Sequence, residues 1–549
     1  MVGRRRPGNF KGVNCILSKQ FKPNRALAGK LIALSASFLI AINLSVALAQ
    51  TGAVGSSQLP TLGDGSDIGS SAERRLGDRI ARELYRDPDY LDDPVLADYV
   101  QGIWQPLMAA ARTRGDLTPE LEERFAWEIL LGRDRSVNAF ALPGGYLGVH
   151  LGLIAVVANR DELASVLGHE LSHVTQRHIS RLMSKQSQQA PWMIGAMILG
   201  ALAASKSANA GNAMMVGSQA LAMQNQLNFS RDMEREADRV GFGIMTQAGF
   251  EAQGFASMFD KLQQASRLND NGAYPYLRSH PLSTERIADM RSRQVLDPGA
   301  TTPPTTAEHA MIVARARVLS NPGIDALRAL RVEAQGDAFN ALNASRQSGA
   351  LYGAALAANK MRDFTEAREY LARLGVHVNS NDRAQRLVRW LEVEVALTAG
   401  NASLAATTMD SPAPVSNNLT DRAASRPEIL LGAMAAIRLG ERGGVQRAAQ
   451  RLQSWVATHP RDAQAWQLLS GAHAAQGHTL RAIRADAETQ VAQLDYAAAL
   501  TRFKAAQDML RGGTAGRSGD AAADHIDASI IDTRQRQVEL LLREQTLDR

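Results

Sequence analysis

Apolar residues recur at helical spacing over much of the first half of the chain. Leu76, Ile80 and Leu84 stand four residues apart within a helical pattern that covers residues 73–112. A second, stronger helix is predicted over residues 159–182, where an Asn followed by a Glu three residues later resembles a capping box. These two patterns are the firmest secondary-structure signals before residue 186.

Two shorter segments, residues 125–130 and 138–149, have the character of strands. The second contains Pro143-Gly144-Gly145, which suits a sheet edge or a turn and not a central strand. This part of the chain is therefore predicted to combine helices with a small β-sheet.

Beyond a linker rich in Pro and Thr at residues 295–306, the pattern is almost wholly helical, in short amphipathic pairs. Several segments fit the roughly 34-residue tetratricopeptide pattern loosely, among them the run Ala499, Phe503 and Ala506. No single repeat is clean, so a generic helical bundle is the alternative. We predict a mainly α protein that ends in an all-α tetratricopeptide-like solenoid over residues 307–549.

Composition agrees with this prediction and adds a constraint on size. A chain of 549 residues is too long for one compact core, so two or three folded units are expected. Hydrophobic residues at 45% and charged residues at 21% describe a globular protein, and aromatic residues at 5% favour helices over a β-sandwich.

The N-terminus has the form of a secretory signal peptide. Residues 1–49 contain eight basic residues and no acidic one, followed by an apolar run from Leu31 to Leu48 and an Ala-Leu-Ala end. Cleavage is predicted after Ala49, and an uncleaved membrane anchor is the alternative. Without these eight basic residues, the rest of the chain has 53 basic and 55 acidic residues. The net charge of +6 therefore gives no reason to expect nucleic acid as a partner. The single cysteine, Cys15, lies inside this signal.

The predicted domain order is a signal peptide at 1–49, a flexible lead-in at 50–71, a catalytic domain at 72–294, the linker at 295–306 and the helical repeats at 307–549. A stretch over 186–230 carries Lys206 as its one charge and is rich in Met. Its apolar core is too short for a membrane span. It either packs against the catalytic core or forms a mobile lid.

The second predicted helix carries the chemistry. It contains His169-Glu170-Leu171-Ser172-His173, and a spacing of four places the two histidines on one helical face, about 40° apart. Two imidazoles so placed can bind one zinc ion, and Glu170 can take a proton from water that the metal activates. A chance occurrence of the motif is the alternative, and its position on a helix argues against chance.

A zinc site with two histidines needs a third protein ligand. The run from Ser230 to Asp238 supplies Glu234 and Asp238, four residues apart and so on one helical face. Glu234 is the candidate ligand. Asp238 is predicted either to accept the outer N–H of a ligand histidine or to carry protons. Glu236 points elsewhere and is predicted to be solvated.

Together, His169-Glu170-x-x-His173, Glu234-x-x-Ala237-Asp238 and the upstream Asn138-Ala-Phe-Ala-x-Pro-Gly-Gly resemble the gluzincin family that includes the CAAX prenyl proteases. The resemblance is specific over residues 70–295. The signal peptide and the C-terminal helices are similar to those of periplasmic bacterial members. The prenyl protease relatives span membranes, whereas no membrane-spanning helix is predicted in this chain after residue 49, which argues against CAAX processing.

The resemblance implies one Zn²⁺ per chain, held by the metal ligands His169, His173 and Glu234. It also implies that Glu170 is the catalytic base and Asp238 a supporting acid. Members of this type have a His-Pro-Leu element near the metal, which His280 would supply here. Its role stays open between a fourth ligand, a latch in the substrate position, an oxyanion donor and a plain helix-entry turn. His178, about 140° from the ligand face, is interpreted as structural.

Two functions follow from these features. The first is a periplasmic zinc-dependent endopeptidase of protein quality control that degrades misassembled outer-membrane proteins and assists their assembly, a substrate class implied by the resemblance alone. The second is a periplasmic chaperone or adaptor that works through the repeat helices, with latent peptidase activity. The expected partners are unfolded or misassembled proteins and the outer-membrane protein assembly machinery. Peripheral contact with a membrane is compatible with this prediction.

Overall fold

The computed structural model describes residues 69–185, 231–267, 273–293, 305–320, 323–411, 425–512 and 521–547. All of them belong to one compact unit, Ser66–Arg549. The predicted signal peptide, the lead-in before residue 69, the Met-rich stretch at 186–230 and most of the linker lie outside the described residues.

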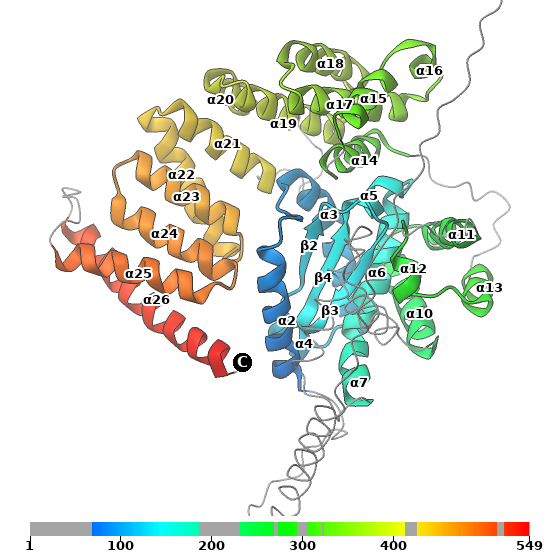
Figure 1. The fold of residues 1–549 in the computed structure, drawn as a ribbon, viewed down its shortest axis with the longest axis horizontal. Helices are drawn as coiled ribbons and strands as arrows, with labels where there is room; N and C mark the ends of the chain where they lie inside the picture. Colours follow the sequence, from blue (N-terminus) through cyan, green and yellow to red (C-terminus); the bar gives the residue numbers. More distant parts are fainter. Residues whose placement is uncertain are drawn as a thin grey trace, which may run out of the picture. The chain divides into compact units, whose positions relative to one another are not determined.

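A four-stranded sheet lies in the first half of this unit, with the strand order β1-β2-β4-β3 (Figure 1). Its strands are β1 (Tyr90–Leu91), β2 (Glu128–Gly132), β3 (Ala139–Leu142) and β4 (Tyr146–His150). The central pair, β2 and β4, is parallel, and each edge strand runs antiparallel to its neighbour.

The single strand predicted over 138–149 is two strands joined by the short helix η1 (Pro143–Gly145). Gly144 and Gly145 have φ angles of 72° and 82°, which L side chains rarely adopt. The chain therefore reverses there, and β3 becomes the edge strand next to β4. The prediction that Pro-Gly-Gly marks an edge or a turn is confirmed.

Helices surround this sheet in the first half of the chain. Their bounds are α2 (Ser70–Tyr85), α3 (Pro94–Arg114), α4 (Pro119–Arg124), α5 (Leu151–Val156), α6 (Arg160–Thr175), α7 (His178–Lys185), α10 (Arg231–Gln247), α11 (Gln253–Arg267), α12 (Tyr276–Ser279) and α13 (Thr284–Ser292). The continuous helix predicted over 73–112 is interrupted, because β1 separates α2 from α3. Asp93 caps the restart by accepting a hydrogen bond from the Leu96 amide at 2.9 Å.

The motif-bearing helix α6 is buried along nearly its whole length. Asn159 caps it as predicted, accepting from the Glu162 amide at 3.0 Å. Every residue from Glu162 to Thr175 is buried. The helix ends seven residues before the predicted Leu182, because Arg177 has a φ of 53° and turns the chain into the separate helix α7.

The second half of the described chain is all-helical, as predicted. Its helices are α14 (Ala307–Leu319), α15 (Ile324–Glu333), α16 (Gly336–Asn340), α17 (Ala344–Lys360), α18 (Phe364–His377), α19 (Asp382–Thr398), α20 (Ala402–Asp410), α21 (Arg426–Leu439), α22 (Arg442–Thr458), α23 (Ala463–Ala475), α24 (Thr479–Ala492), α25 (Tyr496–Arg511) and α26 (Ala521–Leu547). Most pack against the next helix along the chain. The fold is therefore mainly α with one small sheet.

Two adjacent aspartates at the start of α3 bind arginines of the C-terminal helices. Asp93 makes two contacts of 2.8 and 2.6 Å with Arg315 of α14, whose side chain is 3% exposed and also binds Glu394. Asp92 makes two contacts of 2.7 and 2.9 Å with Arg426 of α21. These pairs tie the sheet-bearing half to the helical half.

Among the helices that the structure describes, none combines the length and the apolar character that a membrane span requires.

Candidate metal centre

Helices α6 and α10 cross at two glycines. A Cβ atom on Gly241 would lie 2.9 Å from backbone atoms of Gly168 and His169, and one on Gly168 would lie 3.2 Å from the Gly241 carbonyl oxygen. The two backbones thus approach more closely than larger residues at the crossing would allow. This approach brings Glu234 and Asp238 of α10 against His169 of α6.

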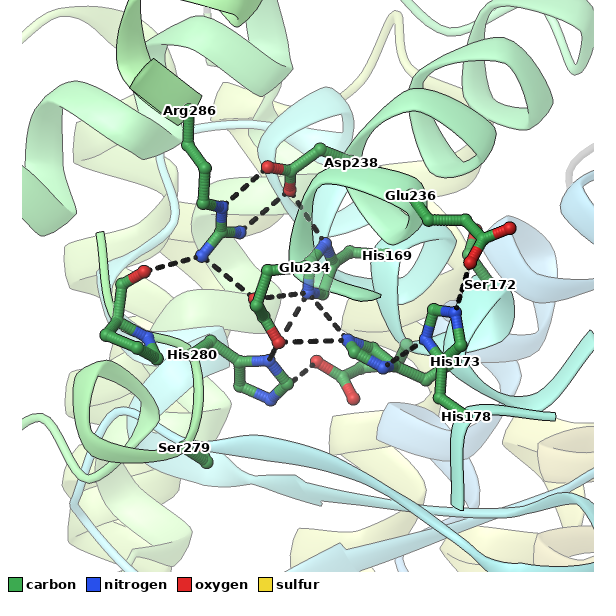
Figure 2. A network of polar contacts seen from close by, with 12 residues as sticks. His169, Ser172, His173, His178, Glu234, Glu236, Asp238, Ser279, His280 and Arg286 are labelled. Carbon is green, nitrogen blue, oxygen red and sulfur yellow. Dashed lines mark hydrogen bonds and ion pairs between the residues drawn. The ribbon is translucent and has the colours of Figure 1, made fainter. Parts of the chain in front are cut away.

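Four buried side chains converge beside this crossing: His169, His173, Glu234 and His280 (Figure 2). One ligand atom from each lies within 4.8 Å of all the others. The Nε2 atoms of His169 and His173 are 3.0 Å apart, and each lies 3.5 Å from the Glu234 carboxylate. Nδ1 of His280 lies 3.3 Å from Nε2 of His169 and 3.0 Å from Oε1 of Glu234. The corners of a tetrahedron around zinc are about 3.3 Å apart, so these spacings suit a single ion.

The charges around the cluster also fit a divalent cation. Glu170, Glu234 and Asp238 carry three formal negative charges, and Arg286 carries one positive charge. Both carboxylate oxygens of Glu170 are buried and accept no hydrogen bond from any residue in the described part of the chain. Its nearest charge partner is Nε2 of His280, 3.5 Å from Oε1, so this buried carboxylate is only weakly compensated and has capacity to bind a further group.

Asp238 fixes the orientation of His169. Its Oδ1 atom lies 3.0 Å from Nδ1 of His169. A carboxylate only accepts, so Nδ1 carries a hydrogen, and Nε2 is the atom that a cation would bind by displacing any proton held there. Burial alone would lower the pKa of His169, but its bonds to Asp238 and Glu234 outweigh burial and raise the pKa to about 10. Of the two roles left open for Asp238, this geometry supports orientation of the ligand.

Arg286 of α13 is a site residue that the sequence reasoning missed. It makes contacts of 2.6 and 2.8 Å with the Asp238 carboxylate and one of 2.8 Å with Oε2 of Glu234. It also donates to the Pro281 carbonyl at 2.9 Å. Burial alone would raise the pKa of Asp238, but Arg286 and His169 outweigh burial and lower it. Arg286 lies six residues after His280 in the sequence, and no spacing rule links it to either helix.

His178, interpreted from the sequence as structural and as far from the ligand face, lies directly against His173. Its Nδ1 atom lies 2.9 Å from Nδ1 of His173, and its Nε2 atom lies 3.1 Å from Oε2 of Glu236. The predicted angle of about 140° assumed one continuous helix, and the turn at Arg177 breaks it. Glu236, predicted to be solvated, also binds Arg181 at 2.8 Å. Burial lowers the pKa of His178 to about 4.

His280 follows the last residue of α12, in the connection to α13. Because α13 begins at Thr284 after a Ser283 cap, the Pro281 helix-entry turn considered from the sequence is wrong. The His280 ring stacks on Tyr276 with ring centres 4.6 Å apart. Its Nε2 atom lies 3.5 Å from Oε1 of Glu170. The structure thus brings together all six residues singled out for the site.

Comparisons with known proteins agree with this geometry. Residues 100–294 match peptidase family M48. The chain is 34% identical over 320 residues to the putative beta-barrel assembly-enhancing protease of Vibrio cholerae, a match that covers 58% of this chain and 63% of that protein. It is 28% identical over 490 residues to the beta-barrel assembly-enhancing protease of Escherichia coli, covering 87% and 92% of the two chains. It is 29% identical over 197 residues to the mitochondrial metalloendopeptidase OMA1 of Saccharomyces cerevisiae, covering 35% and 54%. The matches confirm the family resemblance inferred from the motifs.

Proposed function

We propose, from the match of residues 100–294 to peptidase family M48, that the protein is a zinc-dependent endopeptidase that acts in outer-membrane protein assembly. The observation that carries the proposal is the convergence of three ligand side chains beside a buried carboxylate that accepts no hydrogen bond within the described part of the chain. His169, His173 and Glu234 supply the ligands, and the buried oxygens of Glu170 supply the base. The choice of zinc follows from the mixed imidazole and carboxylate set.

When bound there, zinc would polarise the scissile carbonyl and make water more acidic. Glu170 accepts the proton of the attacking water at a carboxylate oxygen and passes it to the leaving nitrogen. Asp238 holds the hydrogen on Nδ1 of His169, and Arg286 holds Asp238 and Glu234 in place. The burial of these groups strengthens each of these interactions, because little water screens them.

We assign His280 the role of a latch. Its Nδ1 atom lies with the three ligand atoms at spacings that complete a four-ligand set. A catalytic zinc site keeps one position open for water or substrate, whereas four protein ligands close it. His280 therefore favours a closed state, and cleavage requires its displacement. The closed set also favours the second candidate function, an adaptor with latent peptidase activity.

The biological setting belongs to the same proposal. Both bacterial relatives described above carry names that refer to beta-barrel assembly, and the Escherichia coli protein aligns with 87% of this chain. We therefore place the protein in the periplasm, exported by the signal at 1–49, with misassembled outer-membrane proteins as substrates. The helices from residue 307 onward would recruit these substrates as a tetratricopeptide-like domain, separated from the catalytic domain at 295–306.

The test is metal content together with casein cleavage by the chain from residue 50 onward, for the wild type and Glu170→Gln. The endopeptidase hypothesis expects one zinc per chain in both proteins and cleavage by the wild type alone. Zinc without cleavage, even in a His280→Ala background, would favour the adaptor. A wild type that binds no zinc would overturn the site assignment.

A further inference from the structure

Different side chains contact the outer ring nitrogens of His173 and His169, and we call these side chains the support of each ligand. The break at Arg177 places His178 at the start of α7 and directs its ring back toward α6. The His173 and His178 ring centres are 4.9 Å apart at an interplanar angle of 77°. The break itself is anchored, because the Arg177 guanidinium binds the buried Glu73 carboxylate at 2.9 Å. The position of His178 is therefore built into the fold.

These contacts indicate which ring nitrogens of His178 and His173 carry a hydrogen. Glu236 only accepts, so Nε2 of His178 carries a hydrogen and donates it over 3.1 Å. In a neutral imidazole the other nitrogen is then an acceptor. Nδ1 of His178 thus accepts, over 2.9 Å, the hydrogen on Nδ1 of His173. The lone pair of His173 is left on Nε2, the atom that faces Nε2 of His169 at 3.0 Å.

We propose that His178 and Glu236 are positioning residues of the metal site, which hold His173 in the tautomer and orientation that a metal ion requires. The two ligand histidines then have parallel supports. Asp238, clamped by Arg286, lies behind His169, and the His178–Glu236 pair, clamped by Arg181, lies behind His173. Groups behind a ligand of this kind are worth about 10–100-fold in metal affinity.

The two supports differ in their exposure. The Asp238 and Arg286 side chains are 1% and 4% exposed, whereas those of Glu236 and Arg181 are 29% and 40% exposed. Glu236 can therefore be changed without leaving a fully buried charge unpaired, which makes it a cleaner probe than Asp238. The inference rests on the metal site proposed above and is independent of the substrate.

The test measures zinc affinity by competition with a chelator, on the chain from residue 50 onward. His178→Leu should weaken binding about 10–100-fold. His178→Asn, whose amide can accept near the Nδ1 position, should recover most of that loss, and Glu236→Gln should show a loss of a few-fold. The matched control is His309→Leu, because His309 is also buried and has two partners, Tyr99 at 2.6 Å and the Val157 carbonyl at 3.0 Å. It should lower the thermal midpoint and leave zinc affinity within about twofold.

A second readout separates positioning from plain packing. A positioning residue should reduce the rise in thermal midpoint that zinc produces, while the midpoint of the metal-free protein changes little. If wild type binds zinc and the His178 and Glu236 variants bind it equally well, the inference is overturned. If His178→Leu does not fold, an unchanged zinc affinity in both His178→Asn and Glu236→Gln would be sufficient to overturn the inference. A wild type without zinc would refute the proposed function instead.

Discussion

Nε2 of His280 lies 3.5 Å from Oε1 of Glu170, so the ring of one residue stands beside the buried carboxylate of the other. Glu170 is the proposed base, and the space next to its oxygens is where the attacking water must stand. This contact fits the closed arrangement proposed above, in which the group next to the base belongs to the protein itself.

Removal of the latch is expected to activate the enzyme. His280→Ala should raise kcat/KM for casein about tenfold, the factor expected if the closed state is favoured by about 1.4 kcal/mol. Steady-state cleavage assays of wild type and variant at equal zinc occupancy give the measurement. The double variant His280→Ala with Glu170→Gln is the control and should be inactive. Equal rates in wild type and His280→Ala would rule out the latch.

The ligand and its support should be distinguishable by metal binding. Glu234→Gln is expected to weaken zinc binding more than Asp238→Asn, because the Glu234 carboxylate would coordinate the metal directly, whereas Asp238 acts through His169. A loss of about 10–100-fold is expected for Asp238→Asn. Competition with a chelator measures both constants. The reverse order would contradict the assignment of Glu234 as the ligand.

The crossing of α6 and α10 should tolerate no added methyl group. Gly241→Ala is expected to cost about 1–3 kcal/mol of stability and to lower zinc affinity, since a Cβ there meets backbone atoms at 2.9 Å. Gly243→Ala on the same helix is the matched control, because its Cβ would meet the movable end of the Arg114 side chain. Urea unfolding and zinc competition test both variants, and equal effects would show that the crossing does not set the site.

The contribution of Arg286 to the stability of the fold should be largest when no metal is bound. Arg286→Met leaves Asp238 and Glu234 without their cation, which is expected to destabilise the metal-free protein by about 3–5 kcal/mol. Zinc supplies compensating charge, so the loss should be smaller with zinc bound. Thermal midpoints with and without zinc give the comparison. Arg291→Met, which breaks the exposed pair with Asp260, should change either midpoint little.

The Asp93–Arg315 pair should make stability depend on acid. Burial alone would raise the pKa of Asp93, but Arg315 outweighs burial and lowers it below the ordinary 3.8. A carboxylate with a lowered pKa in the folded state contributes stability above pH of about 4 and loses it as the pH falls further. Asp93→Asn should therefore cost roughly 3 kcal/mol at pH 7 and less at pH 3.

Urea unfolding at the two pH values tests this dependence. Asp325→Asn, at a residue whose side chain is 92% exposed, is the control and should have almost no effect at either pH. A loss from Asp93→Asn that is the same at both pH values would contradict the assigned ion pair.

Local patterns predicted the parts of the site that lie within one helix. The spacing of His169 and His173, and that of Glu234 and Asp238, needed only helical geometry, and the structure places each pair as expected. The strand β1 was missed, because it is two residues long and forms only by pairing with β2. Its existence depends on a contact that no local pattern contains.

His178 and Arg286 were missed for a related reason. The predicted angle for His178 was wrong because Arg177 adopts a positive φ, which interrupts the helix, and no glycine in the sequence indicates this break. Arg286 reaches the site only when α12 and α13 fold back onto α10, so its role depends on tertiary packing. A buried cation beside three carboxylates is required by charge balance, but the sequence does not say which arginine provides it.

The two adjacent aspartates at the start of α3 have a consequence for the order of folding. Asp93 meets an arginine 222 residues further along the chain, and Asp92 meets one 334 residues further. At a synthesis rate of about 5–20 residues per second, the arginine for Asp93 follows its partner by roughly 11–44 s and the one for Asp92 by roughly 17–67 s. Until its arginine has been made, each carboxylate lacks its ion-pair partner and stays hydrated. Contacts of such long sequence separation form late, so the catalytic half is expected to reach its final form only after the C-terminal helices have been made.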